Sequence, residues 1–107
     1  MSIEKVREIT KAKALEFDVQ EYKEFDVEGK CSYTDYFIIM TGSSSVNIKA
    51  LAEKIVYECK HSGIAAMGIE GLADGEWCLI DFGEVIINIM IGEKREHYKL
   101  EAIWDEM

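Results

Sequence analysis

The segment WCLIDFGEVIINIM, residues 77–90, constrains the fold more than any other part of the sequence. Its two apolar halves flank Gly83-Glu84, which is a typical short connection between antiparallel strands. If Phe82 pairs with Val85 across this turn, the alternation of strand side chains fixes every other pair in the hairpin. One face of the hairpin is then entirely apolar, which is the pattern of a sheet face that packs against helices. The residues of this first face are Cys78, Ile80, Phe82, Val85, Ile87 and Ile89.

The opposite face of the same hairpin is mixed in character. A second turn signal at Asp74-Gly75 predicts a third strand that pairs with the first strand of the hairpin. The pairs expected on this second face combine an aromatic ring, aliphatic side chains, an amide and carboxylates. They are Asp81 with Ile86, Leu79 with Asn88, Trp77 with Met90, Leu72 with Trp77, Glu70 with Leu79, and Gly68 with Asp81.

This second face is the candidate functional surface. Only two helices of useful length are predicted, and both are needed on the first face, so we expect the second face to meet solvent or a partner protein. An apolar patch ringed by polar groups, with a central Trp, is typical of protein-binding surfaces. Glu70 and Asp81 predict that the partner brings Lys or Arg. The alternative is that the C-terminal tail covers this face with Leu100, Ile103 and Trp104.

The remaining segments complete the predicted architecture. Residues 36–40 form an apolar run, which favours a strand buried on both faces, and an amphipathic helix follows it. The order of elements predicts an α/β (α+β) fold in a single domain of residues 1–107, with one mixed sheet of about five strands and two main helices on one face. The expected helices are 2–17 and 46–61, and the expected strands are 22–27, 34–41, 66–72, 77–82 and 85–91.

Composition limits the classes of function. The 107 residues include 12 basic and 21 acidic side chains, a net charge of −9, so we expect no direct binding to nucleic acid. Residues 1–17 lack the continuous apolar stretch of a signal peptide, and no segment has the roughly 18 apolar residues that cross a membrane. Cys31, Cys59 and Cys78 are far apart, which favours reduced thiols over disulfides or a zinc site. We expect a cytoplasmic protein without a cofactor.

The loop Gly42-Ser43-Ser44-Ser45 lies between a strand and a helix, where backbone N–H groups can hold a phosphate. Nucleotidyltransferases have a similar loop, but they also need a pair of carboxylates to bind a divalent metal. The first acid after Gly42 is Glu53, deep in the helix, and no carboxylate pair accompanies it. We therefore expect Gly42 to permit the turn and a Ser to cap the helix. The competing hypothesis is a phosphoryl- or nucleotidyl-transfer enzyme that uses this loop.

Three segments, TDYFIIMTGSSS, EGLADGEWCLIDFGEVIINIMI and REHYKLEAIWDE, resemble the ribosomal silencing factor family RsfS, also called Iojap-related. They cover about residues 34–105 in the family's order and spacing. The resemblance implies a nucleotidyltransferase-like fold without the catalytic carboxylates, and therefore a protein that is not an enzyme. It further implies binding to the large-subunit ribosomal protein uL14, which sterically blocks joining of the two subunits and represses translation. Mitochondrial relatives act in large-subunit assembly.

The resemblance also assigns residues. The family commonly has His where this chain has Asn88, and an Asn forms hydrogen bonds but gains no charge near neutral pH. The same face could instead join two copies of the chain in a homodimer. The family pattern is matched at Asp35, Tyr36, Gly42, Ser44, Glu70, Gly71, Trp77, Leu79, Asp81, Arg95, Tyr98, Leu100 and Trp104. The residues expected to bind uL14 are Glu70, Leu72, Trp77, Leu79, Asp81, Asn88, Met90, Arg95 and Tyr98.

Overall fold

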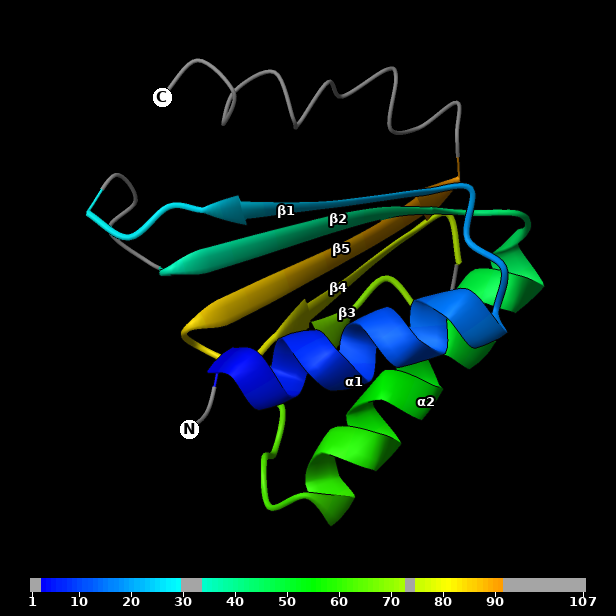
Figure 1. Cartoon of the computed structure of the whole chain (residues 1–107). Coiled ribbons are helices and arrows are strands. Elements are labelled where there is room, and N and C mark those ends of the chain that lie inside the picture. Colours follow the sequence, from blue (N-terminus) through cyan, green and yellow to red (C-terminus); the bar gives the residue numbers. More distant parts are fainter. Residues whose placement is uncertain (1–2, 30–33, 73–74, 92–107) are drawn as a thin grey trace.

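The computed structural model describes residues 3–29, 34–72 and 75–91 (Figure 1). These residues form two helices and five strands, and both helices lie on the same side of the sheet. The predicted α+β class, with one mixed sheet and two helices on one face, is therefore confirmed. The elements are α1 (Ile3–Glu16), β1 (Glu21–Asp26), β2 (Tyr36–Gly42), α2 (Ser45–His61), β3 (Gly68–Glu70), β4 (Trp77–Asp81) and β5 (Val85–Ile91).

The strand order is β1-β2-β5-β4-β3, so β5 is the central strand. It pairs with β2 in parallel and with β4 antiparallel, and the other neighbours pair antiparallel. The predicted register of the hairpin is confirmed, because the Phe82 N–H donates to the Val85 carbonyl oxygen at 2.9 Å. The observed β4–β5 pairs are Trp77 with Met90, Cys78 with Ile89, Leu79 with Asn88, Ile80 with Ile87, and Asp81 with Ile86.

The larger core lies between the first face of the sheet and the two helices. The apolar stripe of α2 is completely buried against this face, as its helical spacing predicts. Burial raises the pKa of the Cys59 thiol to about 11, so Cys59 is protonated at neutral pH and acts as a small apolar side chain. The buried residues of the α2 stripe are Ile48, Leu51, Ala52, Ile55 and Cys59.

β3 is shorter than the predicted strand 66–72, since it spans only Gly68–Glu70. Gly71 has a φ of 86°, in the left-handed region, and the chain leaves the sheet there. A Cβ at Gly71 would lie 1.9 Å from the carbonyl oxygen of Trp77, so the two backbones pass too close for any side chain. The expected pair of Leu72 with Trp77 on the second face is therefore wrong: Leu72 packs against the helix-side core.

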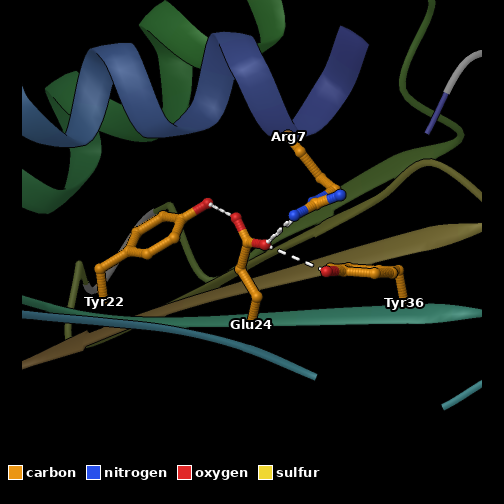
Figure 2. A network of polar contacts seen from close by, with 4 residues as sticks. All are labelled: Arg7, Tyr22, Glu24 and Tyr36. Atoms are coloured by element: carbon orange, nitrogen blue, oxygen red, sulfur yellow. Dashed lines mark hydrogen bonds and ion pairs between the residues drawn. The ribbon is translucent and has the colours of Figure 1, made fainter. Parts of the chain in front are cut away.

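A polar network joins α1 to the edge of the sheet (Figure 2). The Glu24 carboxylate on β1 accepts hydrogen bonds from Arg7 Nε at 2.9 Å, from the Tyr22 hydroxyl at 2.6 Å and from the Tyr36 hydroxyl at 3.0 Å. Arg7 Nη2 lies 2.7 Å from the same carboxylate, whose side chain is 13% exposed. Burial acts to raise the pKa of Glu24, but the bonds from Tyr22, Arg7 and Tyr36 outweigh it and hold that pKa below 4.5.

We expect Gly71→Ala to destabilise the fold by about 3 kcal/mol or more, because left-handed strain costs about 1–2 kcal/mol and steric overlap about 1–3 kcal/mol. Gly63→Ala is the matched control, since Gly63 has a φ of 84° but open space around its Cβ position. It should lose only about 1–2 kcal/mol. Urea unfolding of both variants measures the difference, and equal losses would contradict the close approach of Gly71 to Trp77.

We expect the Glu24 network to make stability depend on acid pH. Because the folded-state pKa of Glu24 is lowered, its contribution is complete above the ordinary value of 4.5 and is lost as pH falls through the folded-state value. Glu24→Gln should cost about 1–3 kcal/mol at pH 7 and should flatten the loss of unfolding free energy between about pH 5 and pH 3. Glu53→Gln, at an exposed position on α2, is the control. Parallel acid profiles for wild type and Glu24→Gln would refute this role.

Candidate partner-binding face

The second face of the sheet is the side opposite α1 and α2 (Figure 1). The strand registers arrange its described residues in three rows that run across the strands from β1 towards β3. The first row is Glu21, Thr41, Met90 and Trp77; the central row is Lys23, Ile39, Asn88, Leu79 and Glu70; the third row is Phe25, Phe37, Ile86, Asp81 and Gly68.

The structure confirms the predicted neighbours on β3, β4 and β5. It also places residues of β1 and β2 on this face, which the sequence does not predict. Phe37 and Ile39 from β2 are buried with Ile86 and Met90 in a second, smaller core, and Phe25 from β1 packs against it. Residues 36–40 are apolar without interruption, so alternation could not assign them to a face. The parallel pairing of β2 with β5 supplies that assignment, and no short-range sequence signal predicts this pairing.

The centre of the second face is closed to water, which corrects the expectation that this face is open to solvent. Met90 and Ile39 are 0% exposed and Asn88 is 1% exposed. β5 lies between β2 and β4, so large apolar side chains flank its residues on both sides. A residue can therefore belong to this face without offering surface to a partner, and Met90 is in that position.

The second face is accessible along both of its edges, at β1, where Glu21 and Lys23 are exposed, and along β4 and β3, where the expected contact residues lie. Trp77, Leu79 and Asp81 are half-buried, and Glu70 is exposed. These four expected contact residues are therefore brought together on one strip of the surface. Arg95 and Tyr98 lie outside the described residues, and so does the alternative cover of this face by Leu100, Ile103 and Trp104.

A polar pair lies inside this otherwise apolar centre. Trp77 Nε1–H donates to Asn88 Oδ1 at 2.7 Å, and because an indole nitrogen only donates, this bond fixes which way the amide of Asn88 points. The other amide atom, Asn88 Nδ2, is buried and has no hydrogen-bond partner. The centre of the second face thus holds an amide of which only one half is satisfied.

The carboxylate of Asp81 has a structural partner within the chain. Asp81 Oδ1 accepts a hydrogen bond from the Gly83 N–H at 2.7 Å, which closes the turn between β4 and β5. The side chain expected to attract a cationic partner therefore also helps to set the hairpin register. A test of its charge must keep this bond.

The Gly-Ser loop provides the N-cap of α2. Ser44 is the N-cap of α2, because its backbone is extended and its hydroxyl oxygen accepts a hydrogen bond from the Asn47 N–H at 3.1 Å. A Cβ at Gly42 would lie 2.4 Å from Ile48 Cγ1, so this position needs glycine. The predicted capping Ser is confirmed, whereas Gly42 ends β2 without a positive φ and is needed for its close packing against Ile48 rather than for a turn.

Two properties of the described residues bear on other functions. Within residues 3–29, 34–72 and 75–91, no cluster of three or more His, Cys, Asp and Glu side chains has the arrangement to bind a metal ion. In the same part of the chain, neither helix is both long and apolar enough to cross a membrane.

These features define an α+β domain with helices on one face of a mixed sheet and a Trp-containing second face. The family model described as "Ribosomal silencing factor during starvation" matches residues 2–107, and the chain belongs to this family. A ribosomal silencing factor from Haemophilus influenzae is 44% identical over 80 residues, which cover 75% of this chain and 78% of that protein. The predicted family is therefore confirmed.

Other similarities extend to organelles and to solved structures. The mouse protein named mitochondrial assembly of ribosomal large subunit protein 1 is 37% identical over 75 residues, which cover 67% of this chain and 33% of that protein. A crystal structure from Chromobacterium violaceum matches with a TM-score of 0.92 and 30% identity, covering 98% of this chain and 88% of that one. A crystal structure from Bacillus halodurans, with a TM-score of 0.83 and 23% identity, covers 94% of each chain and supports the fold alone.

We expect Asp81→Ala to destabilise the protein by about 1 kcal/mol, because the Gly83 N–H loses its acceptor. Asp81→Asn retains an oxygen acceptor at the same position and should keep most of that stability. Urea unfolding of the two variants checks the difference. If they are equally destabilised, the hydrogen bond to Gly83 does not contribute and the charge of Asp81 does.

Proposed function

We propose that this protein is a ribosomal silencing factor that binds uL14 of the large ribosomal subunit through the second face of its sheet. Bound there, its bulk would block joining of the small subunit and repress translation. The observation that best supports this proposal is the accessible strip along β4 and β3, where Trp77 and Leu79 lie beside Glu70 and Asp81. A large aromatic anchor next to charged groups is typical of a protein contact.

The residues of the strip have distinct proposed roles. Trp77 and Leu79 supply apolar contact, and Glu70 and Asp81 pair with Lys or Arg of the partner. Met90 is buried in the smaller core and packs beside Trp77, its cross-strand neighbour on the same face. Leu72 is left out of the contact set because it packs on the helix side. Arg95 and Tyr98 remain proposed contacts from the family pattern alone.

The steric part of the proposal follows from the two-layer architecture. A domain of residues 1–107 that binds through the second face carries α1 and α2 on its far side, as a layer added over the partner (Figure 1). Blocking a surface in this way needs no catalytic group, and we propose that the protein has no enzymatic activity. We also propose that it acts in the cytoplasm and does not contact nucleic acid directly. The rival phosphoryl- or nucleotidyl-transfer activity gains no support from the Gly-Ser loop, whose Ser44 hydroxyl is the helix cap.

We expect Trp77→Ala and Asp81→Asn each to weaken binding to uL14 by about 1–3 kcal/mol, because one removes the apolar anchor and the other removes a charge while keeping the turn. Tyr57→Ala is the matched control: Tyr57 is an aromatic residue that is 54% exposed on α2, on the opposite layer. Calorimetric titration with purified uL14 measures the affinities. Co-sedimentation with isolated large subunits, followed by a subunit-joining assay, tests the consequence.

Three results separate this proposal from its competitors. Unchanged binding of both second-face variants, with loss of binding in Tyr57→Ala, would refute the assignment of the face. Saturable binding of ATP with Mg²⁺ would favour the transfer enzyme. Self-association that rises with concentration in sedimentation and is abolished by Trp77→Ala would favour a homodimer through this face.

A further inference from the structure

We propose that Asn88 Nδ2 donates a hydrogen bond to the protein that binds the second face. The acceptor on that partner is neutral, such as a backbone carbonyl oxygen. This inference rests on the proposed function and names the chemistry of the contact. Asn88 is 1% exposed, and its Nδ2 has no hydrogen-bond partner. A buried donor without an acceptor is costly, and a native structure rarely keeps one without a reason.

The position of Asn88 defines where an acceptor can come from. Asn88 is the middle residue of the central row, between Ile39 on β2 and Leu79 on β4. Both flanking side chains are aliphatic and offer no oxygen. The helices lie on the other side of the sheet, and no described helix or strand lies over the second face (Figure 1). The described residues supply no acceptor for Nδ2, and we infer that the partner seated on this face supplies it.

The bond from Trp77 makes the orientation of Asn88 specific. Because the indole N–H occupies Oδ1 at 2.7 Å, the amide cannot turn over without losing this bond, and Nδ2 stays the unpaired atom. Trp77 is itself one of the accessible residues of the strip. A partner that contacts Trp77 is therefore adjacent to the unsatisfied Nδ2 donor of Asn88.

The charges around Asn88 favour a neutral acceptor over a carboxylate. Among the described residues of the three rows, Glu21, Glu70 and Asp81 are acidic and Lys23 is basic. A partner carboxylate would meet this net negative charge, whereas a carbonyl oxygen would not. Asn88 itself carries no charge and adds none to this face.

Two other buried polar side-chain atoms in the described residues lack a partner, both of them oxygens, and neither is on the second face. Thr10 Oγ1 belongs to a hydroxyl in the interior of α1, which can rotate towards a carbonyl of its own helix. Asn47 Oδ1 belongs to a half-buried residue at the start of α2, whose Nδ2 already donates to the Phe17 carbonyl oxygen. Asn88 alone of the three is on the proposed contact face.

The first test replaces the amide by an apolar side chain of similar size. Asn88→Leu removes the unsatisfied Nδ2 donor together with the acceptor of the Trp77 Nε1–H, and the two effects oppose each other, so the free protein should unfold at about the same urea concentration as wild type. Its affinity for uL14 should nevertheless fall about tenfold or more, because the partner's acceptor is left unpaired. Ile86→Leu, two residues away on the same face of β5, is the control and should change neither quantity appreciably.

A second measurement needs no folded variant. In wild-type protein labelled with ¹⁵N, the two side-chain amide protons of Asn88 report the bond directly. Titration with uL14 should move one of these two protons downfield, as expected when it gains an acceptor, and should slow its exchange with solvent. The side-chain amides of Gln20, which is exposed, and of Asn47, whose Nδ2 donates to the Phe17 carbonyl oxygen, provide the internal reference.

The outcomes separate this inference from the proposed function. Loss of affinity in Asn88→Leu together with the amide shift supports the hydrogen bond from Asn88 Nδ2 to the partner. If Trp77→Ala weakens binding but the Asn88 amide does not shift, or if Asn88→Leu binds as wild type does, the inference fails and the proposed function stands. If wild-type protein binds neither uL14 nor large subunits, the proposed function fails and this inference fails with it.

Discussion

The register of β5 is the constraint on which both faces of this protein depend. Its alternation sends Val85, Ile87 and Ile89 towards the helices and Asn88 and Met90 to the second face. A slip of one residue would place the amide of Asn88 beneath α2 and expose the core residues. The parallel pairing with β2 and the antiparallel pairing with β4 hold the same register from both sides, so neither strand can shift without disturbing the other.

The parts of the fold that the sequence predicts are those set by neighbours along the chain. The β4–β5 pairs follow from one short turn and strict alternation, and the buried stripe of α2 follows from helical spacing. The end of β3 does not follow in this way, because it depends on how closely Gly71 approaches the Trp77 carbonyl oxygen. The predicted position of Leu72 on the second face is wrong for that reason, because Gly71 turns the chain away from the sheet before Leu72.

The sequence predicts which residues of β3 and β4 share the candidate face, but it does not predict which residues of that face are exposed to solvent. Glu70, Trp77, Leu79 and Asp81 share one strip, as alternation requires. The sequence does not predict the contribution of β2. Phe37 and Ile39 lie on this face because β2 pairs in parallel with β5, and these strands are far apart in sequence. Phe37 and Ile39 pack there with Ile86 and Met90, and the centre of the face is buried.

Glu24 on the helix side and Asn88 on the second face differ in how far the chain itself completes their hydrogen bonds. On the helix side, Glu24 has donors from three residues, and the network joins α1 to β1 and β2 (Figure 2). A group completed within the chain stabilises the fold and offers nothing further to a partner. On the second face, the amide of Asn88 has one bond and one unpaired donor. An apolar residue at position 88 would avoid the free-energy cost of a buried, unpaired donor. That cost is explained best by a partner molecule that accepts a hydrogen bond from Nδ2.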